Sequence, residues 1–97
     1  MHEITFRVKQ QLVCNNINYL LLEMYSNKLL PEKSVTNIIA VDKQGDLVWV
    51  VERPKTKFDI YSRMRLEESN LIAYTSGGHY HQIDQNTGKI LSDKMIK

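Results

Sequence analysis

The sequence predicts an all-β fold: an antiparallel meander of about eight strands, arranged as two blade-like sheets that pack into a small sandwich. Three observations indicate this fold. Stretches of alternating apolar and polar residues recur along the chain, and turn-forming residues interrupt them roughly every eight to twelve residues. A segment made of two such stretches and the turn between them also recurs later in the chain. At 97 residues, the chain is expected to form a single β domain over residues 1–97.

Composition excludes several classes of protein. An apolar fraction of 42% and a charged fraction of 25% are typical of a folded chain. No apolar run approaches the roughly 20 residues of a membrane-spanning helix, and the N-terminus lacks the pattern of a secretion signal. The single cysteine, Cys14, cannot form an internal disulfide, which fits a reducing cytoplasm. We therefore expect a cytoplasmic protein without a membrane partner.

The first third of the chain contains one clear strand and one ambiguous segment. Alternation from Ile4 to Cys14 predicts a strand whose even-numbered residues face the core. Asn15 and Asn16 then predict a tight turn, because asparagine tolerates the left-handed conformation. Residues 17–30 fit either a strand buried on both faces or a short helix, and the preceding turn favours a strand. Residues 31–36 are expected to form a loop.

Clearer strands follow from residue 37 onward. The stretch "NIIAVDKQGDLVWVVE" predicts two strands around a turn in which Gly45 supplies a positive φ, with Trp49 in the core. Pro54 predicts a loop or a sheet edge after them. The stretch "FDIYSRMRL" alternates again, and further turns are expected at residues 67–70, 77–78 and 86–88. Its predicted inward residues are Phe58, Ile60, Met64 and Leu66, and its predicted outward residues are Asp59, Tyr61, Arg63 and Arg65.

An internal repeat relates residues 37–51 to residues 70–84, with Asn37 aligned to Asn70. Ala40 and Ala73 are then identical, and His81 is aligned with Val48. The repeat predicts two units of one meander, each too small to bury its apolar face alone.

The hairpins "NIIAVDKQGDLVW" and "LIAYTSGGHYHQIDQNTGKIL" resemble propeller blades that carry an Asp…Thr-Gly-Lys turn. More closely, they resemble a group of small bacterial proteins with two such hairpins in tandem, which occur as immunity proteins of toxin systems, including contact-dependent growth inhibition. The resemblance covers Asn37 to Leu91. The resemblance implies that the chain binds a partner, the C-terminal domain of a cognate toxin such as a ribonuclease. The resembling proteins share no catalytic motif, so none is expected in this chain. The triplet His79-Tyr80-His81 departs from the pattern, which we interpret as partner specificity.

The candidate partner-binding residues lie on the predicted outward face of residues 58–66, at the turn after it and at the tip of the second hairpin. Tyrosine and arginine are enriched in interface hot spots, and acidic residues would meet the positive groove of a nuclease. These candidates are Tyr61, Arg63, Arg65, Glu67, Glu68, Tyr74, His79 and His81. Five cations between Arg53 and Arg65 leave two alternatives open, a nucleic-acid-binding module and a solvated face without a partner.

The sequence predicts no metal site and no enzyme. His79 and His81 share a strand face, but a zinc site needs at least three protein ligands. The nearest carboxylate, Asp84, has the wrong strand parity, and the only other histidine is His2. We therefore interpret the pair as hydrogen-bonding or surface residues, one partly buried and the other exposed. Paired carboxylates, a catalytic triad and a glycine-rich phosphate loop are not recognisable, so no cofactor and no small-molecule substrate are expected.

Overall fold

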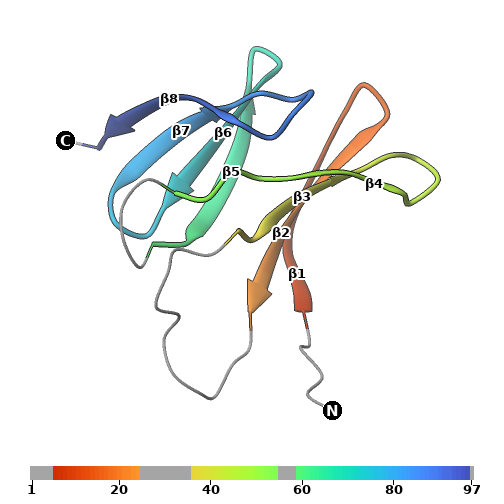
Figure 1. Cartoon of the computed structure of the whole chain (residues 1–97), viewed down its shortest axis with the longest axis horizontal. Helices are drawn as coiled ribbons and strands as arrows, with labels where there is room; N and C mark the ends of the chain where they lie inside the picture. The colour runs from red at the N-terminus through yellow and green to blue at the C-terminus, as the bar shows by residue number, and fades with distance from the viewer. Residues whose placement is uncertain (1–5, 25–35, 55–58, 97) are drawn as a thin grey trace.

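The computed structural model describes residues 6–24, 36–54 and 59–96 and confirms the all-β fold (Figure 1). The first four-stranded antiparallel sheet contains β1 (Phe6–Cys14), β2 (Ile17–Met24), β3 (Ile38–Val41) and β4 (Leu47–Val50). The second contains β5 (Tyr61–Glu67), β6 (Asn70–Thr75), β7 (His79–Ile83) and β8 (Ile90–Met95). Spatial order follows chain order in both sheets, so each sheet is a meander. The described part of the chain holds no helix that could span a membrane.

The turns adopt the conformations that their residues favour, with one exception. Asn15 and Asn16 have φ values of 51° and 65°, and Gly45 has a φ of 87°, as predicted. The turn between β5 and β6 places Glu68 and Ser69 at φ values of 49° and 68°. Neither residue is a glycine or an asparagine, so this turn carries backbone strain that the asparagine turn avoids.

The ambiguous segment after the first turn is a strand over Ile17–Met24. β2 pairs with β1 on one side and with β3 on the other, so it lies inside its sheet. Leu21 is completely buried, and Leu20 is half-buried. The rest of the ambiguous segment, residues 25–30, lies outside the described residues, as does Phe58.

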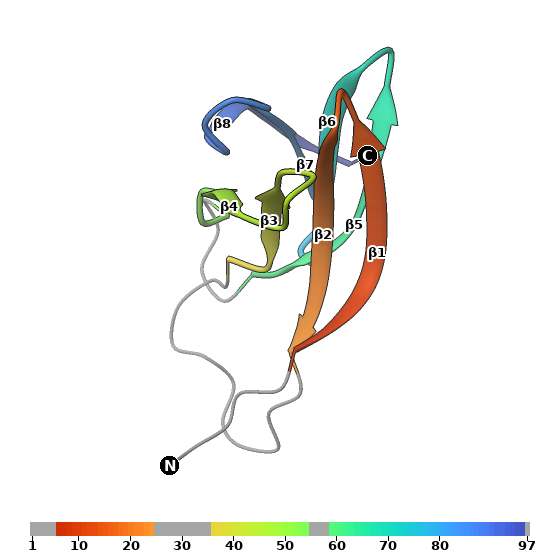
Figure 2. The same cartoon turned by 90° about the vertical axis from the view of Figure 1, so that its right-hand side faces the viewer.

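The buried faces of the two sheets form one core, and the β1–β2 hairpin runs beside β5 (Figure 2). Trp49 lies in this core, as predicted, and its ring stacks on that of Tyr19 with 5.8 Å between centroids. The first sheet contributes Tyr19, Leu21, Ile38, Ala40, Trp49 and Val51, and the second contributes Tyr61, Met64, Leu71, Ala73 and Ile83.

Two irregularities in strand pairing change which residues face the core. In β1 the register shifts between Val8 and Gln10, and Val8 is 49% exposed instead of buried. In β5 the register shifts between Tyr61 and Arg63, so Tyr61 faces the core and is only 2% exposed. The prediction that Tyr61 faces outward is therefore wrong, because one extra residue in a strand reverses the facing of those before it.

Asp59 is also buried, contrary to its predicted outward position. Its carboxylate lies before β5 and accepts hydrogen bonds from the backbone nitrogens of Ile60 and Gly77, each at 2.9 Å, and from Ser76 Oγ at 2.8 Å. These bonds satisfy the buried carboxylate and hold the β6–β7 turn against the start of β5.

Two amide side chains join the sheets along the free edge of β5. Gln10 Nε2 donates to the Met64 carbonyl at 2.5 Å, and Gln10 Oε1 accepts from the Met64 nitrogen at 2.9 Å. Asn37 Nδ2 donates to the Tyr61 carbonyl at 2.7 Å, and its Oδ1 accepts from the Tyr61 nitrogen at 3.0 Å. Each amide thus takes the place of a peptide group on a neighbouring strand, which satisfies the edge of β5.

A second junction connects the end of β4 to the turn between β7 and β8. Trp49 Nε1 donates to the Gln85 carbonyl at 2.8 Å, and the Glu52 nitrogen donates to the Gly88 carbonyl at 2.8 Å. Glu52 Oε1 accepts from the Ile90 nitrogen at 2.9 Å. The ring of Trp49 lies directly against Gly88, where a Cβ atom would come within 2.6 Å of it.

Candidate binding face and histidine cluster

The outer face of the second sheet carries an open groove of about 530 Å³. Successive residues of a strand point to opposite faces, so this face takes alternate side chains from β5 to β8. Residues in it include Arg63, Arg65, Ile72, Tyr74, Tyr80, Gln82, Ser92 and Lys94, with Glu67 and Glu68 at the end nearest the β5–β6 turn.

One row of paired residues crosses all four strands on this face. Arg63 pairs with Tyr74, Tyr74 with Tyr80, and Tyr80 with Lys94. We refer to these four residues as the cation–tyrosine row. The guanidinium carbon of Arg63 lies 4.2 Å from the centroid of the Tyr74 ring, and the two tyrosine rings are 5.8 Å apart. Cation–π and aromatic contacts of this kind hold the rings in place on the strands.

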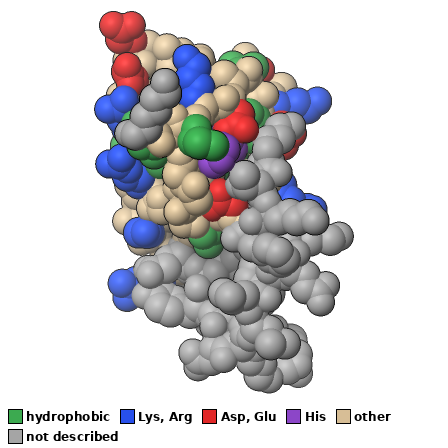
Figure 3. All heavy atoms as spheres, turned by 90° about the vertical axis from the view of Figure 1, so that its left-hand side faces the viewer, with side chains coloured by type: hydrophobic (Ala, Val, Ile, Leu, Met, Phe, Trp, Pro, Cys, Tyr) green, Lys and Arg blue, Asp and Glu red, His purple; other side chains and the backbone are tan. Residues whose placement is uncertain are grey.

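A separate cluster lies on the opposite face, on β7 and the edge strand β8. His81 pairs with Asp93, and Asp93 Oδ1 lies 3.0 Å from His81 Nε2 and 2.9 Å from His79 Nδ1. The three ligand-type atoms all lie within 4.8 Å of one another. The side chain of His81 is 1% exposed, whereas those of His79 and Asp93 are 16% and 33% exposed. Figure 3 shows histidine atoms at the surface beside acidic side chains.

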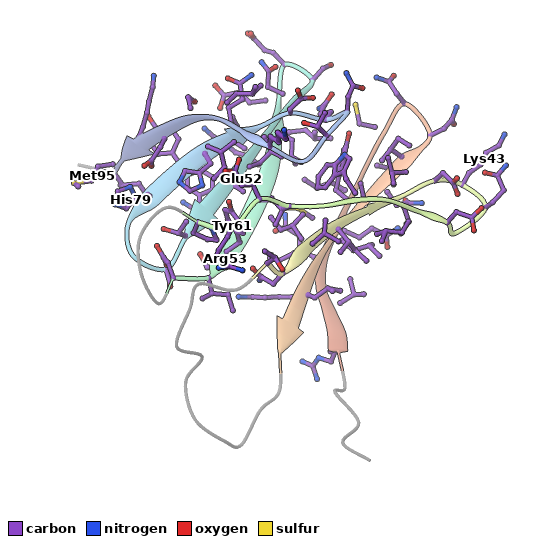
Figure 4. The ribbon with its side chains drawn as sticks, viewed as in Figure 1. Lys43, Glu52, Arg53, Tyr61, His79 and Met95 are labelled. Atoms are coloured by element: carbon purple, nitrogen blue, oxygen red, sulfur yellow. The ribbon has the colours of Figure 1, made fainter. Side chains whose placement is uncertain are left out.

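Tyr61 lies on the core side of this cluster, between the two sheets and near Glu52 (Figure 4). Its hydroxyl donates to the Glu52 carbonyl at 3.0 Å and lies 3.0 Å from His81 Nδ1. A hydroxyl has a single hydrogen, so when it donates to Glu52 it can only accept from Nδ1 of His81. In that arrangement His81 Nε2 carries a lone pair directed toward Asp93.

Burial and charge shift the pKa values of these groups in different directions. Burial lowers the pKa of His81, although the Asp93 carboxylate opposes this shift. The hydrogen bond from His79 lowers the pKa of Asp93, so this carboxyl group remains ionised. Burial, reinforced by the charges of Glu52 and Asp59, raises the pKa of Tyr61, so its hydroxyl remains protonated. At neutral pH the cluster therefore combines a neutral His81 with a carboxylate.

The internal repeat shows that a histidine occupies an aromatic core position. In the first sheet Ala40 pairs with Trp49, and in the second its counterpart Ala73 pairs with His81. His81 is thus the structural counterpart of Trp49, whereas the sequence alignment placed it opposite Val48. Trp49 follows Ala40 by nine residues, whereas His81 follows Ala73 by eight, and this difference of one residue shifts the alignment. Burying an imidazole is less favourable than burying an indole, so this replacement suggests a functional role for His81.

The structure divides the sequence-predicted site residues between the two faces. Arg63, Arg65, Glu67, Glu68 and Tyr74 come together in the outer groove. The three others, Tyr61, His79 and His81, lie on the opposite face. Both histidines are more buried than expected, since His81 is completely buried and His79 is half-buried instead of exposed.

Sequence reasoning missed Tyr80, Lys94 and Asp93. Strand parity could have identified Tyr80, since it alternates with the two histidines. Lys94 and Asp93 are placed by the register between β7 and β8, which no local pattern specifies. The expectation of no metal site rested on the lack of a third ligand, and Asp93 is a candidate for that ligand.

Comparison with known proteins identified one family. A family model described as a domain of unknown function (DUF7957) matches residues 2–95. No curated protein matches the chain, and no solved structure does.

Proposed function

The chain belongs to the DUF7957 family, and we propose that it is an immunity protein that binds the C-terminal domain of a cognate bacterial toxin and blocks its active site. The proposed binding surface is the outer groove of the second sheet. This function requires a complementary surface of about 800 Å² on each partner and no chemistry by the chain itself.

The observation that carries the proposal is the cation–tyrosine row. Tyrosine and arginine are the residue types that most often dominate binding energy at protein interfaces. Here they lie on strands, and Arg63 and Tyr80 contact Tyr74 from either side. Little side-chain freedom is therefore lost when a partner binds, which favours affinity.

The turn at the end of the groove supports the same surface. Glu68 keeps a left-handed conformation, with a φ of 49°, where asparagine or glycine would be more stable. Backbone strain of this kind concentrates at functional sites, where the surrounding structure holds it in place. Glu68 also lines the groove, together with Glu67.

The charges of the groove indicate how a partner would be oriented. Arg63 and Lys94 are at opposite ends of the cation–tyrosine row, where they would pair with acidic groups of the partner. Glu67 is paired with Arg65 within the groove, so Glu68, at the β5–β6 turn, is the acidic group that would meet a basic group of the partner, such as one in the substrate groove of a ribonuclease. This arrangement of complementary charge fixes orientation and speeds association more than it increases affinity.

The same row favours one alternative function, the binding of single-stranded nucleic acid. Two adjacent tyrosines flanked by cations could stack bases and contact phosphates. Glu68 opposes this alternative, because it would repel a phosphate backbone at the groove's end, where Glu67 also neutralises Arg65. Binding of RNA would weaken steeply with salt, which distinguishes it from binding of a protein.

Recovery of the partner from cells that encode the chain tests the proposal. A tagged chain is expected to recover a toxin C-terminal domain in a one-to-one complex, and co-expression of the chain should protect cells from that domain. Recovery of RNA that salt releases would instead support the alternative. A toxin domain that remains active in the complex would contradict the proposed block of its active site.

Replacing Tyr74 with alanine should weaken binding of the recovered toxin domain by about 2 kcal/mol, or roughly 30-fold, because Tyr74 is at the centre of the cation–tyrosine row. The dissociation constant is measured by calorimetry. Arg63→Ala should weaken binding in the same direction. Its matched control is Arg53→Ala, an exposed arginine outside the groove, which should leave the constant within about twofold. Equal effects of the two arginine variants would place the interface elsewhere.

A further inference from the structure

We propose that His79, His81 and Asp93 form a binding site for one divalent transition-metal ion, with zinc as the best match. The site is independent of the proposed toxin-binding groove, because it lies on the opposite face of the second sheet. Nothing in the proposed immunity function requires it, and the two proposals can fail separately.

The donor set is the first argument for this site. Two imidazole nitrogens and one carboxylate oxygen suit zinc and neighbouring metals, whereas calcium and magnesium prefer oxygen ligands alone. The three residues occur on two adjacent paired strands, so the backbone holds them in position. A zinc ion that is accessible to solvent is usually bound by three protein ligands, and its fourth coordination position is open.

The distances are the second argument. Ligand atoms bound to one tetrahedral zinc ion at about 2.0–2.2 Å stand roughly 3.3 Å apart. Asp93 Oδ1 lies 2.9 Å and 3.0 Å from the two histidine nitrogens, and all three atoms lie within 4.8 Å of one another. Small rotations of the partly exposed side chains of Asp93 and His79 would accommodate the ion without moving the buried ring of His81.

The groups behind His81 provide an independent argument. A histidine that binds metal usually donates its other ring N–H to a fixed acceptor, which sets its tautomer and orientation. Nδ1 of His81 has such an acceptor in the Tyr61 hydroxyl, which in turn donates to the Glu52 carbonyl. This chain of hydrogen bonds leaves Nε2 free to coordinate. The strand position is occupied by Trp49 in the other sheet, so the fold itself does not require a histidine there.

His79 and Asp93 reach the surface whereas His81 does not, so the open coordination position of a bound ion would face solvent. Water or an anionic group would fill it, because two neutral imidazoles and one carboxylate leave a divalent ion with a net positive charge. A bound ion would also link β8 to β7. β8 is an edge strand whose side chains are all exposed or half-buried. Metal binding should therefore stabilise the folded protein.

Without an ion, the same three side chains can form a hydrogen-bonded cluster. Asp93 then accepts a hydrogen bond from His79 Nδ1, and it accepts one from His81 Nε2 when the Tyr61 hydroxyl donates to His81 Nδ1 instead of to the Glu52 carbonyl. Titration of untagged, chelator-treated protein with Zn²⁺ alone separates these arrangements. We expect one saturable site per chain, a rise in Tm with zinc concentration, and, with Co²⁺, the visible absorption bands of a tetrahedral ion bound by nitrogen and oxygen. The absence of saturable binding would overturn the proposal and leave the hydrogen-bonded cluster.

Variants at the two partly exposed ligands, His79 and Asp93, keep the test independent of folding. His79→Ala and Asp93→Asn should each weaken zinc binding at least 100-fold, whereas Asp84→Asn, at a carboxylate outside the cluster, should leave it within twofold. Tyr61→Phe should weaken binding 10- to 100-fold, because it removes the partner of His81 Nδ1. Zinc affinity that survives His79→Ala and Asp93→Asn would overturn the proposal, because the ion would then bind elsewhere. Tyr74→Ala should leave zinc binding unchanged, which distinguishes this site from the groove.

Discussion

Replacement of Gly88 with alanine is expected to lower the free energy of unfolding by about 2–4 kcal/mol. Gly88 has a φ of 78°, which costs an alanine about 1 kcal/mol. The new Cβ atom would also lie 2.6 Å from Cε3 of Trp49 and 3.0 Å from the Val50 carbonyl. Trp49 cannot easily move away, because its indole nitrogen is bonded to Gln85 and its ring stacks on Tyr19. Overpacking of this kind costs a further 1–3 kcal/mol, roughly.

Gly45 provides the matched control for this prediction. Its φ of 87° is similar, but no atom lies within 4 Å of the position where its Cβ would be placed. Gly45→Ala should therefore lower the free energy of unfolding by about 1 kcal/mol, which is the cost of placing an alanine at a positive φ. Urea denaturation of the two variants isolates the contact with Trp49. Equal losses of stability would show that the junction between β4 and the β7–β8 turn is not tightly packed.

Replacement of Asn37 with alanine is expected to lower the free energy of unfolding by a similar amount, about 2–4 kcal/mol. The side chain is buried, and its amide bonds both the nitrogen and the carbonyl of Tyr61 as well as the carbonyl of Leu22. Alanine would leave the nitrogen and carbonyl of Tyr61 without these partners between the sheets. Each buried polar group left unsatisfied costs about 1–3 kcal/mol.

The internal repeat supplies the control for Asn37. Asn70 occupies the equivalent position in the second unit, but it is exposed, and its side chain accepts a single bond from Gln82 at 3.2 Å. Asn70→Ala should change stability by no more than about 0.5 kcal/mol. Thermal or urea unfolding of both variants measures the difference. An Asn37→Ala variant as stable as Asn70→Ala would contradict the assignment of the Asn37 amide as a link between the sheets.

Much of the fold could be predicted because period-2 alternation and turn chemistry are local. Asn15, Asn16 and Gly45 have the backbone conformations that their residue types favour, and the strands between such turns followed directly. The segment beginning at Ile17 was ambiguous because both faces of β2 take apolar residues: Leu21 is buried on one face, and Leu20 and Leu22 are half-buried on the other. Tyr61 was misplaced because alternation carries no information about a bulge.

Strand parity predicts which residues of one strand share a face, and the candidate sites could be predicted only to that extent. Arg63, Arg65 and Tyr74 share a face because they follow alternation on β5 and β6 after the bulge. The meeting of His81 with Asp93 depends on the register between β7 and β8, which core packing and the turn determine together. The contact between Tyr61 and His81 further requires the path of β5 relative to β7. No pattern within one segment contains that information.

The most direct test of the proposed binding surface is an NMR titration of the isotope-labelled chain with the recovered toxin domain. The largest amide shift changes are expected at the cation–tyrosine row and at Glu67 and Glu68, while β3 and β4 should remain nearly unchanged. Changes confined to the first sheet, with Arg63, Tyr74 and Tyr80 unaffected, would contradict the assignment of the groove as the binding surface.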